Sequence, residues 1–159
     1  MGINEENKLL KILQEQFKNA FNYTEDDYLH AFGKASQVLL ASIIFFPDFV
    51  EIDSRIFLKR NVLDQDVIRK MLEDGGEDIT EVEKKFNFIE VDFLFDGGGR
   101  DLAEDADIVF AQIIKTAWDA WLKYQYPSRK FIVEIIDVEG TGESLGVQFC
   151  EESKFSIYD

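Results

Sequence analysis

The chain has 159 residues, and its 32 Asp and Glu against 17 Lys and Arg give a formal net charge of −15. An apolar fraction of 46% and an aromatic fraction of 14% exclude an acidic disordered chain, which carries few aromatic residues. We therefore expect a single globular domain over residues 1–159.

The first third of the chain is predicted to be helical. Apolar residues at three- and four-residue spacing predict an amphipathic helix over 5–21. Thr24, followed by three acidic residues, is the predicted N-cap of a second helix that runs to about Phe46. Pro47 ends that helix, and its increasingly apolar C-terminal half is expected to be almost wholly buried.

The middle of the chain is predicted to mix short strands and helices. Alternating residues over 49–58 indicate two short strands that turn at Asp53-Ser54, or one bent strand. Asp64 is the predicted cap of a helix over 65–73, and 78–86 favours a further helical turn or two. Residues 88–95 favour a strand, with a helix left open.

The last third gives the clearest pattern. A glycine loop at 96–100 precedes a long helix over 101–124, whose predicted core stripe includes Val109, Ile113 and Trp121. The segments 130–138 and 145–151 predict a β-hairpin. The expected fold is α+β, with the N-terminal helices and the long helix packed on a small, mostly antiparallel sheet that includes this hairpin.

The sequence holds no complete catalytic or metal-binding motif. One Cys and one His, Cys150 and His30, exclude an intramolecular disulfide and the multi-cysteine or multi-histidine metal sites. Leu102 stands where a dinucleotide-binding loop needs its last glycine, and Leu94 stands at a ligand position of the EF-hand pattern that begins at Asp92. We therefore expect no enzyme, no cofactor and no bound metal.

The charge is concentrated in one segment. Residues 73–107 contain 13 acidic and 3 basic residues, a net charge of −10, whereas residues 1–72 have a net charge of −2. Such a segment favours a basic protein partner and disfavours nucleic acid and membranes, which need a basic footprint. The predicted partner-binding residues are these carboxylates and two aromatic residues typical of binding hot spots: Glu73, Asp74, Glu77, Asp78, Glu81, Glu83, Asp96, Asp101, Glu104, Asp105, Trp118 and Tyr126.

The functional hypothesis is a small binding protein that docks onto a basic protein partner. In size, acidity and lack of catalytic motifs, the chain is similar in composition to bacterial immunity proteins that neutralise cognate toxins, including nucleases. An acidic start and apolar runs too short to cross a bilayer lead us to expect a cytoplasmic location. The alternative is a small-molecule or divalent-metal site, or an enzyme, built on carboxylates near the 96–107 glycine loop. For Trp118 and Tyr126, a place in the core is the competing interpretation.

Overall fold

The computed structural model describes residues 6–20, 22–74, 78–95, 105–137 and 145–152, and its fold is α+β, as predicted. A three-stranded antiparallel sheet has the order β3 (Phe88–Glu90), β5 (Leu145–Glu151) and β4 (Phe131–Asp137). A separate antiparallel pair is formed by β1 (Phe49–Ile52) and β2 (Arg55–Leu58).

The predicted C-terminal hairpin is confirmed, because β4 pairs with β5 with Ile135 opposite Val147. β3 pairs along the other edge of β5 and places Ile89 opposite the same Val147. The predicted strand over 88–95 is confirmed for three residues only, since a 3₁₀ turn over Val91–Phe93 follows it. Gly146 permits the close approach of β3, because a Cβ there would lie 2.0 Å from the Phe88 ring.

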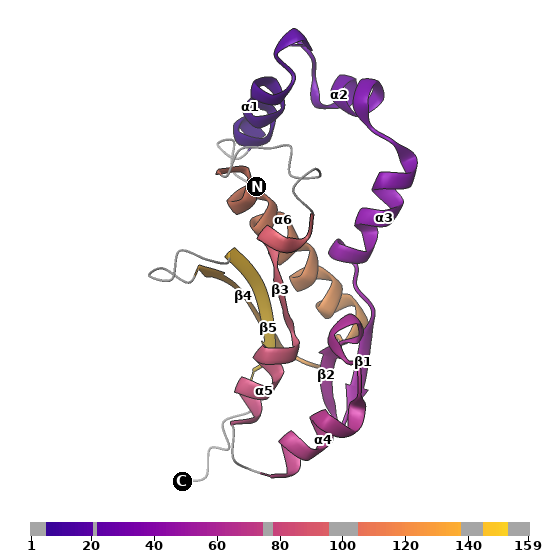
Figure 1. Ribbon diagram of the computed structural model, residues 1–159, viewed down its shortest axis with the longest axis vertical. Coiled ribbons are helices and arrows are strands. Elements are labelled where there is room, and N and C mark those ends of the chain that lie inside the picture. The colour runs from indigo at the N-terminus through magenta and orange to yellow at the C-terminus, as the bar shows by residue number, and fades with distance from the viewer. Residues whose placement is uncertain (1–5, 21, 75–77, 96–104, 138–144, 153–159) are drawn as a thin grey trace.

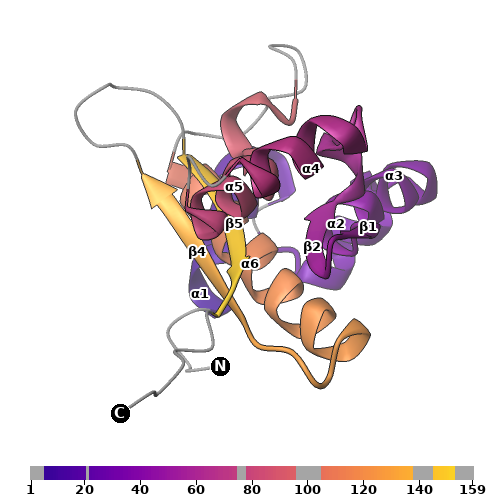
Figure 2. The ribbon, with the colours of Figure 1, turned by 90° about the horizontal axis from the view of Figure 1, so that it is seen from below.

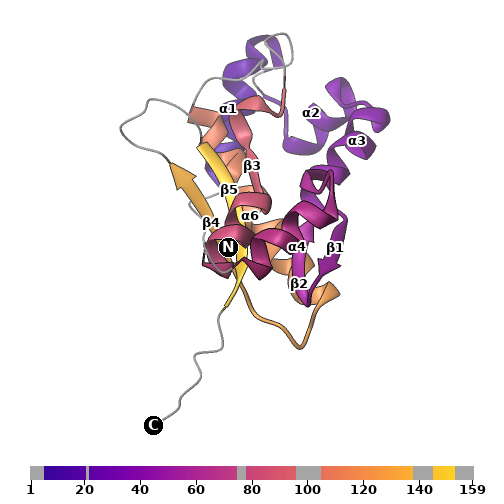
Figure 3. The same cartoon turned by 60° about the horizontal axis from the view of Figure 1, so that its bottom comes forward.

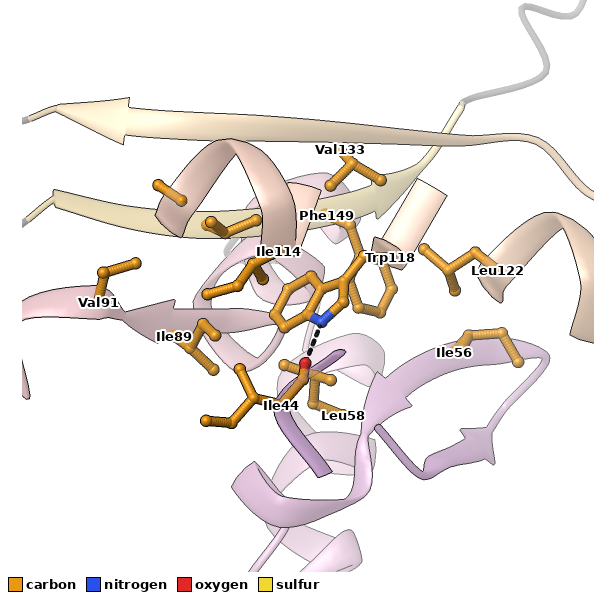
Figure 4. Close-up of a cluster of buried hydrophobic side chains, with 12 residues drawn as sticks. Ile44, Ile56, Leu58, Ile89, Val91, Ile114, Trp118, Leu122, Val133 and Phe149 are labelled. Carbon is orange, nitrogen blue, oxygen red and sulfur yellow. Dashed lines mark hydrogen bonds between the residues drawn. The ribbon is translucent and has the colours of Figure 1, made fainter. Parts of the chain in front are cut away.

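The long helix α6 (Asp105–Gln125) lies alongside the three-stranded sheet (Figures 1 and 2). The main core forms where α6, the sheet, β2 and the end of α3 meet, and Figure 4 shows Trp118 at its centre, next to Phe149. The core stripe predicted for this helix is wrong by one position at Ile113 and Trp121, whereas Ala106 and Phe110, which it also contains, are buried or pack against the core. The residues of α6 in this core are Ala111, Ile114, Trp118 and Leu122.

A second, smaller core lies under the β1–β2 pair. Ile52, Phe57 and Ile68 are buried together there. The pair packs against the two short helices α4 (Gln65–Glu73) and α5 (Ile79–Phe86), and Figure 3 shows α4 beside β1 and β2. The predicted turn is confirmed, because Asp53 and Ser54 both have positive φ, as a tight two-residue hairpin requires. Both helices are confirmed as well.

Local capping signals in the sequence match the structure. The Asp64 carboxylate accepts a hydrogen bond from the Asp66 amide at the start of α4. Thr24 and Asp27 form a reciprocal capping box at the start of α2 (Glu25–Phe32). These caps satisfy amide groups that a helix N-terminus otherwise leaves unpaired.

The helices α1 (Glu6–Gln16), α2 and α3 (Ala35–Phe45) form an arch that projects from the rest of the fold (Figure 1). Both α1 and α3 contact α6, so the arch is attached to the rest of the fold mainly through this helix. Its upper part is held by ring contacts, including Phe17 stacked on Phe32 at 4.2 Å, and by the Tyr28 hydroxyl, which donates to the carbonyl of Ala20.

The prediction of one helix from residue 25 to Phe46 is wrong. The backbone is extended at Gly33 and Lys34, and α2 and α3 are bent by 117°. A Cβ at position 33 would lie 2.5 Å from the Leu29 carbonyl oxygen, so this break depends on a residue without a side chain. The prediction that the C-terminal half of this helix is almost wholly buried is also wrong, because Leu40, Ile43 and Phe46 are exposed.

No helix in the described part of the chain is by itself long and apolar enough to span a membrane; only α2 and α3 taken together reach that length and composition, and they form a bent pair.

Candidate protein-interaction surfaces

The helix α3 exposes most of its apolar side chains. It contains no charged residue. Ile44 is buried, but five large apolar side chains in or directly after the helix are 55% to 71% exposed: Val38, Leu39, Leu40, Ile43 and Phe46. Exposed apolar groups that lie together mark interaction sites more often than isolated ones do. The helix is therefore the first candidate surface.

An apolar groove of about 720 Å³ lies between α1, α3 and α6, and we call it the α1–α3–α6 groove. Leu9 of α1, Leu40 of α3 and Ile113 of α6 line it, and each of them is more than 40% exposed. The polar side chains in its lining are those of Gln37, Arg60 and Asp107. Its volume lies within the usual range of ligand-binding clefts.

The lining of the groove includes four residues of the acidic segment 73–107. Leu94 and Phe95 precede the glycine loop, Ala106 and Asp107 follow it, and all four residues line the groove. The loop residues between them are outside the described part of the chain. An apolar floor next to an acidic segment suits a ligand that is both apolar and basic.

The predicted acidic residues do not form one continuous described surface. Glu73, Asp74, Asp78 and Glu81 are exposed around the end of α4 and the start of α5. Asp105 is the first residue of α6. The remaining exposed-carboxylate predictions lie outside the described residues: Glu77, Asp96, Asp101 and Glu104.

Three of the predicted partner-binding residues belong to the interior instead. Trp118 is 1% exposed and Glu83 is 0% exposed, so the prediction that these two contact a partner is wrong. Tyr126 is half-buried and packs against the main core, with its ring 5.9 Å from that of Phe131.

The indole groups of Trp118 and Trp121 fasten the end of α3 to α6. Trp118 Nε1 donates to the Ile44 carbonyl at 2.7 Å, and Trp121 Nε1 donates to the Pro47 carbonyl at 3.0 Å. Both acceptors lie at or just after the C-terminal end of α3, where helix carbonyls lack intrahelical partners. These aromatic residues therefore support the candidate surface from inside the molecule.

Glu83 is a buried carboxylate whose two oxygens accept no hydrogen bond among the described residues. Its nearest cation is Arg55, with Nη1 at 3.6 Å from Oε2. Burial raises the pKa of Glu83 to about 7, and the charge of Arg55 opposes this shift. The residue therefore holds a proton at a pH where an ordinary glutamate does not.

A network of charges joins Glu83 to three other parts of the fold. Arg129 and Glu151 make two hydrogen bonds, with Nε to Oε1 at 3.1 Å and Nη2 to Oε2 at 2.5 Å. Arg129 also donates to the Ser54 carbonyl, and its Nη1 lies 3.6 Å from Glu51. Arg55 Nη1 lies 4.0 Å from Glu151 Oε2, so the network connects α5, β5, the β1–β2 pair and the chain before β4.

Two observations on the described residues concern metal binding and thiol chemistry. No group of three or more His, Cys, Asp or Glu side chains there is arranged to hold a metal ion. Cys150 is buried, and burial raises the pKa of its thiol, which disfavours the nucleophilic thiolate. The carboxylate site suggested for the 96–107 loop lies largely outside the described residues.

Sequence reasoning missed both the groove and the polar residue that joins the two sheets. Asn87 is buried, and its side chain accepts a hydrogen bond from the Leu58 amide at 2.8 Å and donates one to the Ile56 carbonyl at 2.9 Å. The backbone carbonyl of Asn87 accepts a hydrogen bond from the Phe149 amide. A signal for the groove was present, because α6 has apolar residues on two faces and α3 has no polar face.

Comparison of the chain with protein-family models, with curated proteins and with solved structures gives no significant match.

Proposed function

We propose that this chain is a binding protein that takes up a basic, amphipathic segment of a partner protein in the α1–α3–α6 groove. The observation that carries the proposal is the groove itself. It is apolar and about 720 Å³ in volume, and residues on both sides of the glycine loop of the acidic segment 73–107 line it.

Two physical terms would act together in such a complex. Apolar side chains of the partner would cover Leu9, Leu40 and Ile113, each of which loses contact with water on binding. Lys and Arg of the partner would face a chain with a net charge of −15, and this attraction speeds encounter and selects against acidic partners.

The partner class that we favour is a basic, nuclease-like toxin, which makes this chain an immunity protein of a bacterium. A nuclease carries a basic surface for its phosphate substrate, and carboxylates can occupy such a surface in place of phosphates. The role needs binding without catalysis. The single free cysteine suits a reducing compartment, so the proposal includes a cytoplasmic location.

A pair of designed helical peptides tests the proposal directly. One peptide has a leucine stripe and lysine elsewhere, and its control replaces every lysine with glutamate. We expect the basic peptide alone to bind in a fluorescence anisotropy titration, with an affinity that falls as salt is raised. Equal binding of the two peptides, or binding indifferent to salt, would contradict the proposal.

Two isoleucines of nearly equal exposure provide matched variants. Ile113 lines the groove and is 41% exposed, whereas Ile132 lies on β4 and is 43% exposed. We expect Ile113→Lys to weaken peptide binding about tenfold or more, or roughly 1.4 kcal/mol, and Ile132→Lys to leave it nearly unchanged. Similar losses in both variants would show that net charge alone controls binding and that the groove does not.

Charge reversal at Glu73 and Asp74 separates long-range attraction from contact. Both carboxylates are exposed at the C-terminal end of α4, where lysine is favourable, so the double variant Glu73→Lys with Asp74→Lys keeps the core intact. We expect slower association of the basic peptide in stopped-flow measurements at low salt, with little change in its dissociation rate. A change confined to dissociation would place these residues in the contact itself.

A further inference from the structure

The side of α3 that points away from the groove is a second apolar surface. We call Ala35, Val38, Leu39 and Ser42 the outer face of α3. Successive residues of a helix are about 100° apart, so these four lie opposite Gln37, Ala41 and Ile44, which line the groove. On the outer face, Leu39 is 71% and Val38 is 56% exposed. Phe46 does not belong to this face, because its backbone is not helical and its ring packs edge-on against Trp121 of α6.

The apolar surface on this side of α3 extends to α2. Leu29 of α2 shares a shallow hollow with Val38 and Leu39 and is 61% exposed. These three side chains expose on the order of 300 Å², less than half of the roughly 800 Å² that each partner buries in a standard interface, which indicates a weak, concentration-dependent contact. Ala35, Ser36 and Ser42 are exposed beside them.

The charge around this face points to a second copy of the chain as its occupant. Between Ala31 and Pro47 the sequence contains one charged residue, Lys34, in a protein whose net charge is −15. Copies of such a protein repel each other, and they can approach closely only through a surface that lacks their common charge. A basic partner, in contrast, would gain no ion pairs at this face.

The outer face is complementary to itself at its centre. When α3 is laid antiparallel on a second α3 with its centre between Leu40 and Ala41, Leu39 of one copy falls opposite Ser42 of the other. The most exposed large side chain of the face therefore meets a small one at two equivalent positions, and Val38 falls opposite Ile43 beside them. We propose that the protein forms a symmetric dimer through this antiparallel contact of two outer faces.

Two polar groups fit the same arrangement. Ser42 Oγ donates to the Leu39 carbonyl at 2.6 Å, so its hydroxyl already has a partner when the face is covered. Lys34 falls near Asp48 of the second copy, and both side chains are exposed. Opposite charges at the two ends of an antiparallel pair fix its direction, as a two-fold interface requires.

This dimer does not depend on the proposed function, because the groove lies on the other side of α3. A failure of peptide binding leaves the dimer intact as a proposal, and a monomeric protein leaves the groove intact. The dimer places the two grooves on opposite sides of the paired helices.

Light scattering coupled to size-exclusion chromatography tests the dimer. At tens of micromolar, we expect the wild type to have twice the chain mass of 18.4 kDa. Leu39→Glu should raise the dimer dissociation constant by about thirtyfold or more, as loss of a central interface residue does. Leu39 is already exposed, so the variant should fold normally. Leu63→Glu is the matched control, since Leu63 is 98% exposed and belongs to the segment between β2 and α4 rather than to α3.

Cysteine cross-linking tests the direction and register. One chain carries Leu39→Cys and a second carries Ser42→Cys, and the native Cys150 is buried. With an added oxidant such as oxidised glutathione to accept the two electrons, we expect mixing to give a disulfide-linked heterodimer in higher yield than either variant gives alone. Preferred cross-linking of Leu39→Cys to itself would overturn the antiparallel register.

Three results would overturn the proposal as a whole. The first is a monomeric wild type, and the second is a dimer that Leu39→Glu leaves as tight as before. The third is binding of the wild type to neutral phosphatidylcholine vesicles that the Leu39→Glu variant loses, which would assign the outer face to a lipid surface.

Discussion

The indole N–H of Trp118 donates to the backbone carbonyl of Ile44 over 2.7 Å and thereby joins the centre of α6 to the last turn of α3. Ile44 is buried, whereas its neighbours Leu40 and Ile43 on the same helix are exposed. The attachment of α3 is therefore strongest at its C-terminal end, where the arch meets the main core. Both candidate surfaces, the groove and the outer face, depend on this attachment.

Trp118→Phe should destabilise the protein by about 1–3 kcal/mol, because it leaves the buried Ile44 carbonyl without its donor. Chemical denaturation followed by far-ultraviolet circular dichroism measures the change. Trp121→Phe is the control: Trp121 is half-buried, and its N–H donates to the Pro47 carbonyl at 3.0 Å. We expect a smaller loss there, and an equal loss would show that the two bonds contribute alike.

The elements predicted from the sequence were those whose signals are local. The Thr24 box, the Asp64 cap, the Asp53-Ser54 turn and the C-terminal hairpin each depend on a few neighbouring residues. The break at Gly33 was missed because a glycine within an apolar helical pattern does not reveal the 2.5 Å approach to Leu29 that forbids a side chain.

Burial could be predicted less well, because it depends on which elements meet. Helix α6 is apolar on two faces, and periodicity alone does not identify the one that packs on the sheet. Ile113 was therefore assigned to the core that Ile114 occupies. In the same way, the apolar character of α3 was interpreted as burial, although the chain folds with much of this helix exposed.

Glu83 could have been recognised from its position. Ile79, Val82, Glu83 and Phe86 follow the spacing of one helix face, so a carboxylate stands within an apolar stripe. Among 13 acidic residues in the segment 73–107, it was interpreted instead as one more surface charge.

Glu83 should make the stability of the protein decrease as the pH rises. Its folded-state pKa of about 7 lies above its ordinary value of 4.5, so between these values the folded state binds a proton that the unfolded state has released. The contribution of Glu83 to the free energy of unfolding is therefore full below pH 4.5 and is lost as the pH rises through about 7. The total decrease is about 3 kcal/mol.

Urea denaturation across this pH range should separate Glu83 from the other carboxylates. Glu83→Gln removes the titrating group, so its free energy of unfolding should fall less with rising pH than that of the wild type. At pH 8 the variant should be the more stable protein. Glu81→Gln is the matched control on the same helix, since Glu81 has a side chain 65% exposed. Parallel pH profiles of Glu83→Gln and the wild type would contradict the assignment.

Cys150 should be protected from thiol reagents in the folded protein. The residue is 3% exposed, and burial raises the pKa of its thiol, so both access and thiolate content are low. We expect reaction with a disulfide reagent to be at least about a hundredfold slower in the native protein than in urea, because it needs local opening of the sheet. Rapid native labelling would show that β5 opens readily.

The ends of the proposed dimer contact should respond to charge reversal. Lys34→Asp places a carboxylate near Asp48 of the second copy, and Asp48→Lys places an ammonium group near Lys34; each variant creates two like-charged contacts, because the interface is symmetric. Exposed ion pairs contribute little individually, so we expect each single variant to weaken the dimer roughly threefold to tenfold at low salt.

The double variant restores opposite charges and should recover the wild-type dissociation constant in sedimentation equilibrium. Additive weakening in the double variant would show that these two residues do not meet, because only residues in contact have a coupling energy.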